Sequence, residues 1–312
     1  MCPMCIATAA WIASGTSSAG VLLTLFVKRD RQQPTPSDKA TSISKTPGPA
    51  AQTRHSIGDQ TMKKTQITLA SHNVVSEQEW LQARRAHLLK EKEFTRQRDE
   101  LSRQRRELPW VKVEKSYTFD TPDGNQTLAN LFAGRSQLIV YHFMFGPGWK
   151  EGCKSCSFLV DHLEGAVVHL EHHDVSVAVV SRAPLAELEA YKQRMGWQFG
   201  WVSSNASDFN FDYHVSFSRE QIEKGKVFYN FEMDKISMEE LPGISVFYKD
   251  ADGTIFHTYS SYARGGDLLL TTYNYLDLTP KGRNESGGMD WVKRHDEYDA
   301  PAAAKSSAQP KR

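Results

Sequence analysis

The sequence predicts an α/β protein that contains a parallel sheet. Two continuous apolar runs, Gln137 to Phe145 and Val175 to Ser181, are typical of strands that a parallel sheet buries on both faces. Between them lie a Cys-x-x-Cys motif, Cys153 to Cys156, and a stretch of helical character, Ser157 to His172. A strand, a tight loop, two cysteines and a helix in succession indicate the first half of a βαβα arrangement.

The N-terminus is predicted to be a separate segment. Residues Ile6 to Val27 carry no charge and are just long enough to span a bilayer as a helix. Lys28, Arg29 and Arg31 follow at once, and positive charge on this flank predicts that the rest of the chain stays in the cytoplasm. We therefore expect residues 1–31 to form a membrane anchor, with a loosely hydrophobic, non-inserting leader as the alternative.

The segment after the anchor is predicted to be a disordered linker. Residues 32–73 are rich in Ser, Thr, Pro, Gln and Lys, and they cannot bury enough apolar surface to fold. Met62 is a second candidate for the start of translation, which would leave a cytoplasmic protein without residues 1–61. Ahead of the anchor, Cys2 and Cys5 form a second Cys-x-x-Cys pair. No strand precedes it, so metal capture, lipidation and no specific role all stay open.

A long charged helix is predicted within residues 74–109. Ser76 and Glu79 form a capping box, no Pro or Gly interrupts the stretch from Glu77 to Glu107, and Pro109 ends it. The apolar positions make a narrow, broken stripe at Trp80, Leu81, Leu88, Leu89, Phe94 and Leu101. Such a stripe suits either a solvated helix that packs one edge on its own domain or a homodimer through the 77–107 helix.

Residues 110–298 are rich in aromatic side chains, which predicts a well-packed domain, and a disordered tail follows at 299–312. The remaining expected elements are a strand at Tyr117–Phe119, a short helix at Leu128–Phe132, a helix at Pro184–Met195, strands at Ile244–Lys249 and Thr254–Ser260, and a helical segment at Leu268–Leu276. Two βα units are thus followed by a β-hairpin and a helix. This is the order of elements in the thioredoxin fold, here with an insertion between Trp197 and Glu240.

The first cysteine of the motif is the candidate nucleophile. With Cys153 at the start of a helix, unpaired N–H groups and the helix dipole favour its thiolate, the form that attacks disulfides. Cys156, one helical turn on, can then resolve the mixed disulfide. Half a zinc site and a structural cysteine pair are the alternatives, but the other pair is remote and no histidine has zinc-ligand spacing. We predict that both cysteines are catalytic and expect no metal or other cofactor.

Neighbours of the motif are predicted to tune or cover it. Lys150 and Lys154 could favour the thiolate electrostatically, and Glu151 would oppose them. Trp149 either shields the site or simply packs the loop.

Pro242 is a second supporting candidate. Thioredoxin-like folds place a cis proline just before the strand that faces the two cysteines, which leaves backbone groups free to pair with an extended substrate. Pro242 stands just before the strand at Ile244, but one residue looser than usual, so an ordinary trans proline that ends a loop is the alternative.

Composition argues against several other functions. Lys and Arg number 38 and Asp and Glu number 37, so a net charge of +1 gives no support for nucleic-acid binding through a broad basic face. Four cysteines are too few for a disulfide-stapled secreted scaffold. No Walker-type loop supports nucleotide binding, and no Ser-His-Asp arrangement can be argued from the sequence.

Long motifs of the sequence point to one bacterial family. They are WLQARRAHLLKEKEFTRQRDELSRQRRELPWVKVEK, LIVYHFMFGPGW, EGCKSCSF, VSRAPLAELEAYKQRMGW, DFNFDYHVSF, LPGISVFYKD and YNYLDLTPKGR. Through them the chain, from about Val74 to Tyr298, resembles the bacterial thioredoxin-like proteins of domain-of-unknown-function family eight-nine-nine. The resemblance implies a thioredoxin-like fold with the dithiol at Cys153 and Cys156, and it implies no substrate. Residues 1–61 lie outside the pattern, so the predicted anchor is an addition of this chain.

The sequence therefore favours a thiol–disulfide oxidoreductase. Its partners would be a protein or small-molecule disulfide and an unknown electron donor. A peroxiredoxin-like peroxidase is one alternative, although that chemistry needs a hydroxyl residue between a proline and the cysteine, and none lies between Pro147 and Cys153. The other alternative is a protein that binds a metal through the dithiol or a partner through the charged helix.

Overall fold

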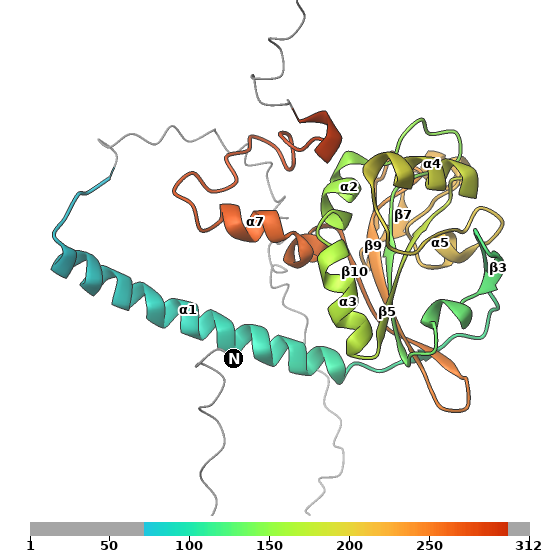
Figure 1. Ribbon diagram of the computed structural model, residues 1–312, viewed down its shortest axis with the longest axis horizontal. Coiled ribbons are helices and arrows are strands. Elements are labelled where there is room, and N and C mark those ends of the chain that lie inside the picture. Colours follow the sequence, from blue (N-terminus) through green and yellow to red (C-terminus); the bar gives the residue numbers. More distant parts are fainter. Residues whose placement is uncertain (1–71, 299–312) are drawn as a thin grey trace, which may run out of the picture. The chain divides into compact units, whose positions relative to one another are not determined.

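The computed structural model of this chain describes residues 72–298 (Figure 1). The predicted membrane anchor, nearly all of the linker and the C-terminal tail lie outside the described residues, as do Cys2, Cys5 and Met62. Among residues 72–298, no helix has both the length and the apolar character needed to cross a membrane. The membrane anchor and the cytoplasmic location stay predictions.

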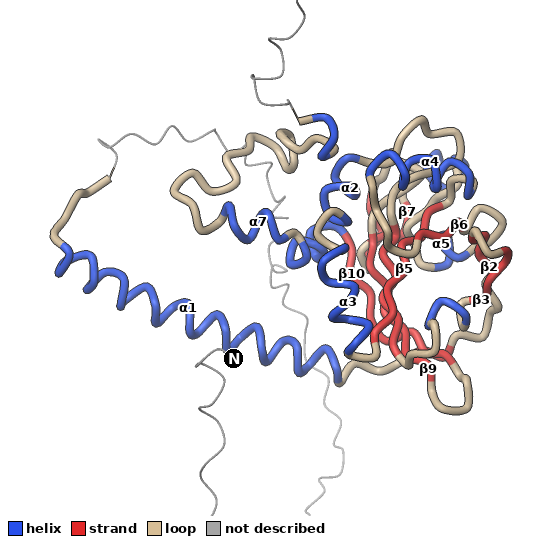
Figure 2. Tube along the Cα trace, viewed as in Figure 1, coloured by secondary structure: helices blue, strands red, loops and turns tan. Residues whose placement is uncertain are grey.

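The described part of the chain is a mixed α/β structure around one sheet of eight strands (Figure 2). In the order β1-β10-β9-β4-β5-β6-β2-β3, strands β4, β5 and β6 run parallel, and the flanking pairs are antiparallel. The strands are β1 (Val111–Lys112), β2 (Thr118–Thr121), β3 (Gly124–Thr127), β4 (Gln137–His142), β5 (Val175–Ser181), β6 (Trp201–Ser203), β9 (Gly243–Lys249) and β10 (Ile255–Tyr262). The predicted α/β class with parallel strands at its centre is confirmed.

Helices and one small hairpin complete the described structure. The helices are α1 (Glu77–Arg106), α2 (Lys154–Val160), α3 (Glu164–His172), α4 (Leu185–Met195), α5 (Phe209–Asp212), α6 (Arg219–Glu223) and α7 (Thr271–Leu276). The 3₁₀ segments are η3 (Asn130–Phe132), η4 (Ala263–Leu269) and η5 (His295–Glu297), and β7 (Val227–Tyr229) pairs with β8 (Glu232–Asp234). The predicted order of βαβα, then ββ, then a helical segment is present.

The single helix predicted at Ser157–His172 is divided into α2 and α3. Between the two helices the backbone tightens to i→i−3 bonds, such as that from Leu163 N to Val160 O at 2.9 Å. Asp161 lies at this break, and its carboxylate accepts a hydrogen bond from Trp197 Nε1 at 2.8 Å. The apolar pattern continues through the break, which is why the sequence predicted one helix.

The insertion predicted between Trp197 and Glu240 is only partly an insertion. Its first strand, β6, pairs with β5 in the main sheet and carries the fully buried Trp201. The remainder, α5, α6 and the β7–β8 hairpin, is added outside that sheet. Three residues are too few to show a strand period, so the sequence analysis missed β6.

Helix α1 begins as predicted and is solvated along its length. Its capping box is formed, with Ser76 N donating to the Glu79 carboxylate at 3.0 Å. None of its side chains is buried, and Leu89 and Phe94 are 68% and 66% exposed. Its last turn reaches the domain through the Arg105 guanidinium, which lies 4.9 Å from the centre of the Tyr259 ring. Pairing of α1 with a second copy stays a prediction.

Both faces of the sheet are buried, and successive residues of β4 point to opposite faces. Leu138 and Val140 join a cluster on one face, whereas Tyr141 lies in the cluster on the face covered by α2 and α4. The cluster that contains Tyr141 is dense in aromatic rings, and Cys156 belongs to it. The parallel strands therefore hold the dithiol helix on a rigid aromatic base.

A buried ion pair ties the end of β5 to the segment before β9. Arg182 Nε donates to Glu240 Oε1 at 2.7 Å, and Ser216 Oγ donates to the other carboxylate oxygen at 2.6 Å. Glu240 is only 2% exposed, and the Arg182 guanidinium stacks 4.4 Å from the centre of the Phe211 ring. A Cβ on Gly146, in the loop after β4, would lie 3.1 Å from Glu240 Cγ, so this loop also packs on the pair.

Replacing Arg182 with glutamine should lower the free energy of unfolding by about 3 kcal/mol, because Glu240 would stay buried without its counter-charge. Urea denaturation measures this change. The control is Arg219→Gln, which breaks an exposed pair with Glu239 and should cost less than about 1 kcal/mol. Equal effects of the two substitutions would contradict a structural role for the buried pair.

Candidate active site

Cys153 lies where the loop after β4 meets the first turn of α2. It immediately precedes the helix and has a non-helical backbone, with φ −57° and ψ 129°. Its N–H donates to Met144 O at 3.1 Å, and its carbonyl accepts from Ser157 N at 2.9 Å. The predicted placement of the first cysteine at a helix N-terminus is confirmed.

The two thiols of the motif have opposite environments. Both are free, but Cys153 is half-buried and Cys156 is 2% exposed. A hydrogen bond with the Cys156 thiol, the N–H groups of Cys156 and Ser155, and the charge of Arg294 lower the pKa of Cys153 to about 6, although burial opposes them. Burial raises the pKa of Cys156 well above its usual range. At neutral pH, Cys153 is therefore the thiolate and Cys156 the proton-bearing thiol.

Arg294 fixes the loop that leads into Cys153. Its Nη2 donates to the carbonyl of Gly152 at 2.7 Å, and its Nε donates to the Tyr191 hydroxyl at 2.8 Å. Its Nη1 lies 3.0 Å from Glu151 Oε2. The side chain is only 15% exposed, so water screens its charge less than it would screen a surface arginine.

Two hydroxyl groups, those of Tyr191 and Ser157, connect Arg294 to the carbonyl of Cys153. Tyr191 Oη and Ser157 Oγ are 2.9 Å apart, and Ser157 Oγ donates to the Cys153 carbonyl at 2.9 Å. Because the single hydroxyl hydrogen of Ser157 goes to that carbonyl, Tyr191 must donate to Ser157. Arg294, Tyr191, Ser157 and Cys153 thus form one directed chain of hydrogen bonds.

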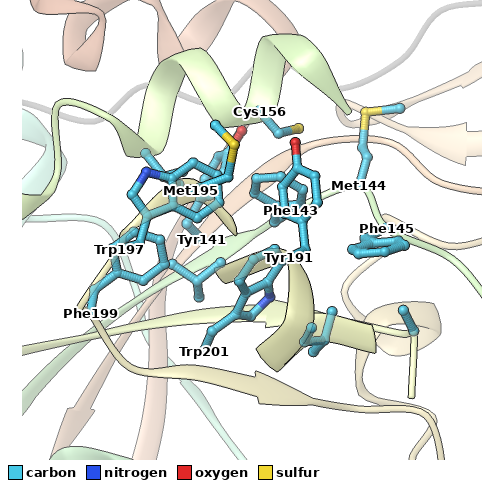
Figure 3. Packing of buried hydrophobic residues seen from close by; sticks show 14 of the residues in the cluster. Tyr141, Phe143, Met144, Phe145, Cys156, Tyr191, Met195, Trp197, Phe199 and Trp201 are labelled. Atoms are coloured by element: carbon cyan, nitrogen blue, oxygen red, sulfur yellow. The ribbon is translucent and has the colours of Figure 1, made fainter. Parts of the chain in front are cut away.

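The residue at position 152 has to be glycine for steric reasons. A Cβ on Gly152 would lie 2.7 Å from Phe143 Cε1, closer than real contacts allow, and 3.1 Å from Tyr191 Cε1, which is also tight. The backbone before Cys153 can therefore approach the aromatic cluster directly. Figure 3 shows Cys156 on α2 over this cluster, whose side chains come from the strands, from the loops that follow β4 and α4, and from α4.

The lysines beside the motif are not the cation that acts on the thiol. Lys150 and Lys154 are exposed, and the positive charge that lowers the pKa of Cys153 belongs to Arg294. Glu151, expected to oppose the thiolate, is instead paired with Arg294 and with Arg194. The sequence analysis considered only charges close to Cys153 in the sequence. Arg294 was therefore missed, because it lies near the C-terminal end of the domain.

Trp149 is half-buried and packs against the same cluster that holds both cysteines. Its backbone N–H donates to Gly146 O at 3.2 Å, which closes the tight turn before the motif. Both expectations for this residue, loop packing and cover for the site, are compatible with that position.

Pro242 lies beside the motif but is not a cis proline. The described residues contain no cis peptide bond. Strand β9 starts directly after Pro242, and its first residue, Gly243, pairs with His142 at the end of β4. The expected free backbone groups are also occupied, because Leu241 N donates to Val215 O at 2.8 Å and Pro242 O accepts from Tyr229 Oη at 2.8 Å.

The sequence analysis missed three residues that surround Cys153. Ser157 and Tyr191 belong to helices that were predicted, but nothing in their spacing marks them as neighbours of the thiol. Arg294 precedes a short 3₁₀ segment and has no periodic signal at all. Among residues 72–298, no group of three or more His, Cys, Asp or Glu side chains is arranged to hold a metal ion.

The chain belongs to the family described as bacterial protein of unknown function (DUF899), which matches residues 69–298. No curated protein matches the chain. Among solved structures it is similar to the peroxidoxin BcpB from Mycobacterium tuberculosis, at 11% identity and a TM-score of 0.35 over 54% of this chain and 97% of that one.

Two further solved structures show a similar degree of likeness. Peroxiredoxin Q from Xanthomonas campestris is 13% identical, with a TM-score of 0.34 over 53% of this chain and 92% of that one. A thiol:disulfide interchange protein from Bacteroides sp. is 15% identical, with a TM-score of 0.31 over 56% and 95%. With TM-scores this low, the likeness does not say which reaction this chain performs.

Replacing Arg294 with glutamine should raise the pKa of the Cys153 thiol from about 6, because a partly buried positive charge beside the thiolate is lost. The rate of iodoacetamide labelling as a function of pH measures this pKa. Near pH 6.5 the variant should be labelled more slowly than the wild type, and at high pH the two labelling rates should converge. Lys154→Gln is the control and should leave the profile in place. An unchanged profile in Arg294→Gln would remove Arg294 from the site.

Proposed function

We propose that this protein is a thiol–disulfide oxidoreductase with a thioredoxin-like fold, in which Cys153 attacks a disulfide and Cys156 resolves it. The observation that carries the proposal is the contrast between the two thiols. One is half-buried, hydrogen-bonded and lowered in pKa, and the other is buried and raised in pKa, three residues further along the same helix. Attack followed by resolution needs this contrast, because the first thiol must be ionised while the second stays protonated until the mixed disulfide has formed.

The reaction begins with the Cys153 thiolate. It forms a bond to one sulfur of the substrate disulfide, the substrate S–S bond breaks, and the second substrate sulfur leaves as a thiolate that takes up a proton. Cys156 then loses its proton and attacks the Cys153 sulfur, which releases the other half of the substrate as a thiol. The substrate is reduced by two electrons and the protein ends as the Cys153–Cys156 disulfide.

The surrounding residues are assigned supporting roles. Arg294 stabilises the negative charge on Cys153 and holds the Gly152 carbonyl, so that the loop keeps its position when the charge is lost. The Tyr191 and Ser157 hydroxyls hold the Cys153 carbonyl on the side of α2. Trp149 covers the loop, and Pro242 lies where β9 approaches the end of β4.

A peroxidase is less well supported. The stretch between Pro147 and Cys153 has no hydroxyl group to hold a peroxide. The nearby Ser157 hydroxyl already donates its hydrogen to the Cys153 carbonyl, and its oxygen accepts from Tyr191. Turnover of hydrogen peroxide at a rate above that of insulin-disulfide reduction would favour the peroxidase instead.

Cys153→Ser should reduce the rate of insulin-disulfide reduction with dithiothreitol to the uncatalysed background, because no nucleophile remains. Cys156→Ser should instead accumulate a covalent mixed disulfide with the substrate, because nothing displaces it. Turbidity measures the first effect, and non-reducing electrophoresis with mass spectrometry measures the second. Wild-type activity of Cys153→Ser would disprove the proposed nucleophile, and trapping through Cys156 would reverse the two roles.

A further inference from the structure

A cavity of about 480 Å³ lies against the dithiol helix. Its walls come from α2, the start of β9, the end of β10 with η4, and the segment 283–289. Much of the lining is apolar, as at Met144, Leu159, Ile244 and Leu270. Cavities of about 300–1,000 Å³ with such linings hold small molecules, whereas a folded protein partner cannot enter one.

One of the two cysteines of the motif lines this cavity. Its lining includes Cys156, with the neighbouring Ser155 and Pro242, and does not include Cys153. A molecule in the cavity would therefore meet the dithiol from the side of the buried cysteine. The substrate of the proposed reaction has to bond to Cys153, so the cavity suits a different participant. In the oxidised protein, an incoming thiolate on this side would attack the sulfur of Cys156.

Attack at that sulfur has a chemical advantage. Disulfide exchange is faster when the departing thiolate is the more stable one. Attack on Cys156 expels the Cys153 thiolate, which Arg294 and the first N–H groups of α2 stabilise. Attack on Cys153 would instead expel the Cys156 thiolate into an apolar environment. The buried cysteine is therefore the better point of attack for any thiol small enough to reach it.

Three of the four charged groups of the lining, Arg264, Asp267 and Arg283, are paired within the protein. Arg264 Nη2 lies 3.0 Å from Asp267 Oδ2, Arg283 Nη2 lies 2.9 Å from Asp277 Oδ2, and Glu285 accepts from the Tyr273 hydroxyl at 2.8 Å. The fourth, Glu285, has no ion-pair partner among the described residues, so a second anionic group on the donor would lose hydration and meet a like charge. The cavity therefore favours a donor that carries no charge apart from the sulfur that reacts.

We propose that this cavity admits a small apolar thiol, uncharged apart from its reacting sulfur, that reduces the Cys153–Cys156 disulfide by attacking Cys156. The inference rests on the proposed function and names the class of its electron donor. The donor thiolate bonds to Cys156, the Cys153–Cys156 bond breaks, and Cys153 leaves as a thiolate. A second donor thiolate then attacks the donor sulfur of the mixed disulfide. Cys156 leaves and takes up a proton, and the donor departs as its own disulfide, oxidised by two electrons.

The test compares two thiols of similar acidity on the oxidised full chain, benzyl mercaptan and 2-mercaptoethanesulfonate. Benzyl mercaptan should reduce the disulfide at least about tenfold faster per thiolate, because its ring is buried in the cavity. Trapping at pH 6 with N-ethylmaleimide followed by peptide mass spectrometry should place the benzyl adduct on Cys156 and the maleimide on Cys153. Equal rates, or a benzyl adduct on Cys153, would overturn the proposal.

Narrowing the cavity provides a second, independent test. A Cβ on Gly266 would lie 3.7 Å from Leu159 Cδ1 and 3.9 Å from Ile244 Cδ1, in ordinary contact and without backbone strain. Gly266→Leu should therefore bring the ratio of the two rates toward one. The matched control is Gly165→Leu on α3, where an added side chain meets open space, and there the ratio should persist. Melting temperatures check that both variants fold.

The two proposals fail in different ways. If Cys153 and Cys156 never form a disulfide, or if no thiol reduces it, the proposed oxidoreductase function is wrong. If the disulfide forms and is reduced, but at equal rates by both thiols or with an unchanged ratio in a folded Gly266→Leu variant, the oxidoreductase stands and the donor site is wrong.

Discussion

In the proposed reaction, the contact between Arg294 and the loop before Cys153 is the interaction that joins the position of the thiol to its charge. The guanidinium group is little exposed, so water screens its charge only weakly. One carbonyl, one tyrosine hydroxyl and the two carboxylates of Glu151 and Glu297 fix its position. Arg294 thereby holds the backbone of Gly152 while it stabilises the neighbouring thiolate. The sheet and the aromatic cluster provide the rigid base that keeps α2 and Tyr191 in register with it.

The second constraint is the difference in burial along a single helical turn. Only Lys154 and Ser155 separate the half-buried Cys153 from Cys156, which has almost no exposure, so the first turn of α2 presents an ionised thiol outward and a protonated thiol inward. Cys156, which bears the inward thiol, also lines the cavity. The two sulfurs therefore face different surroundings, which is why we assign the oxidised substrate to one and the small-molecule donor to the other.

Much of the fold followed from local sequence signals. Buried strands such as β5 were predicted with the correct bounds, and the capping box located the start of α1, because both patterns depend on residues close in sequence. The position of Cys153 at a helix start followed for the same reason. Other features depend on contacts between segments that are distant in the sequence, so no local pattern predicts them. They are the break between α2 and α3, the trans geometry of Pro242 and the role of Arg294.

The reduction potential of the Cys153–Cys156 pair, compared between wild type and Arg294→Gln, tests the central claim most directly. Stabilisation of the thiolate favours the reduced form, so the wild-type potential should lie above the value of about −270 mV that is typical of thioredoxin. Loss of Arg294 should make the potential more negative. A wild-type potential at or below about −270 mV, or one that Arg294→Gln does not change, would contradict the account.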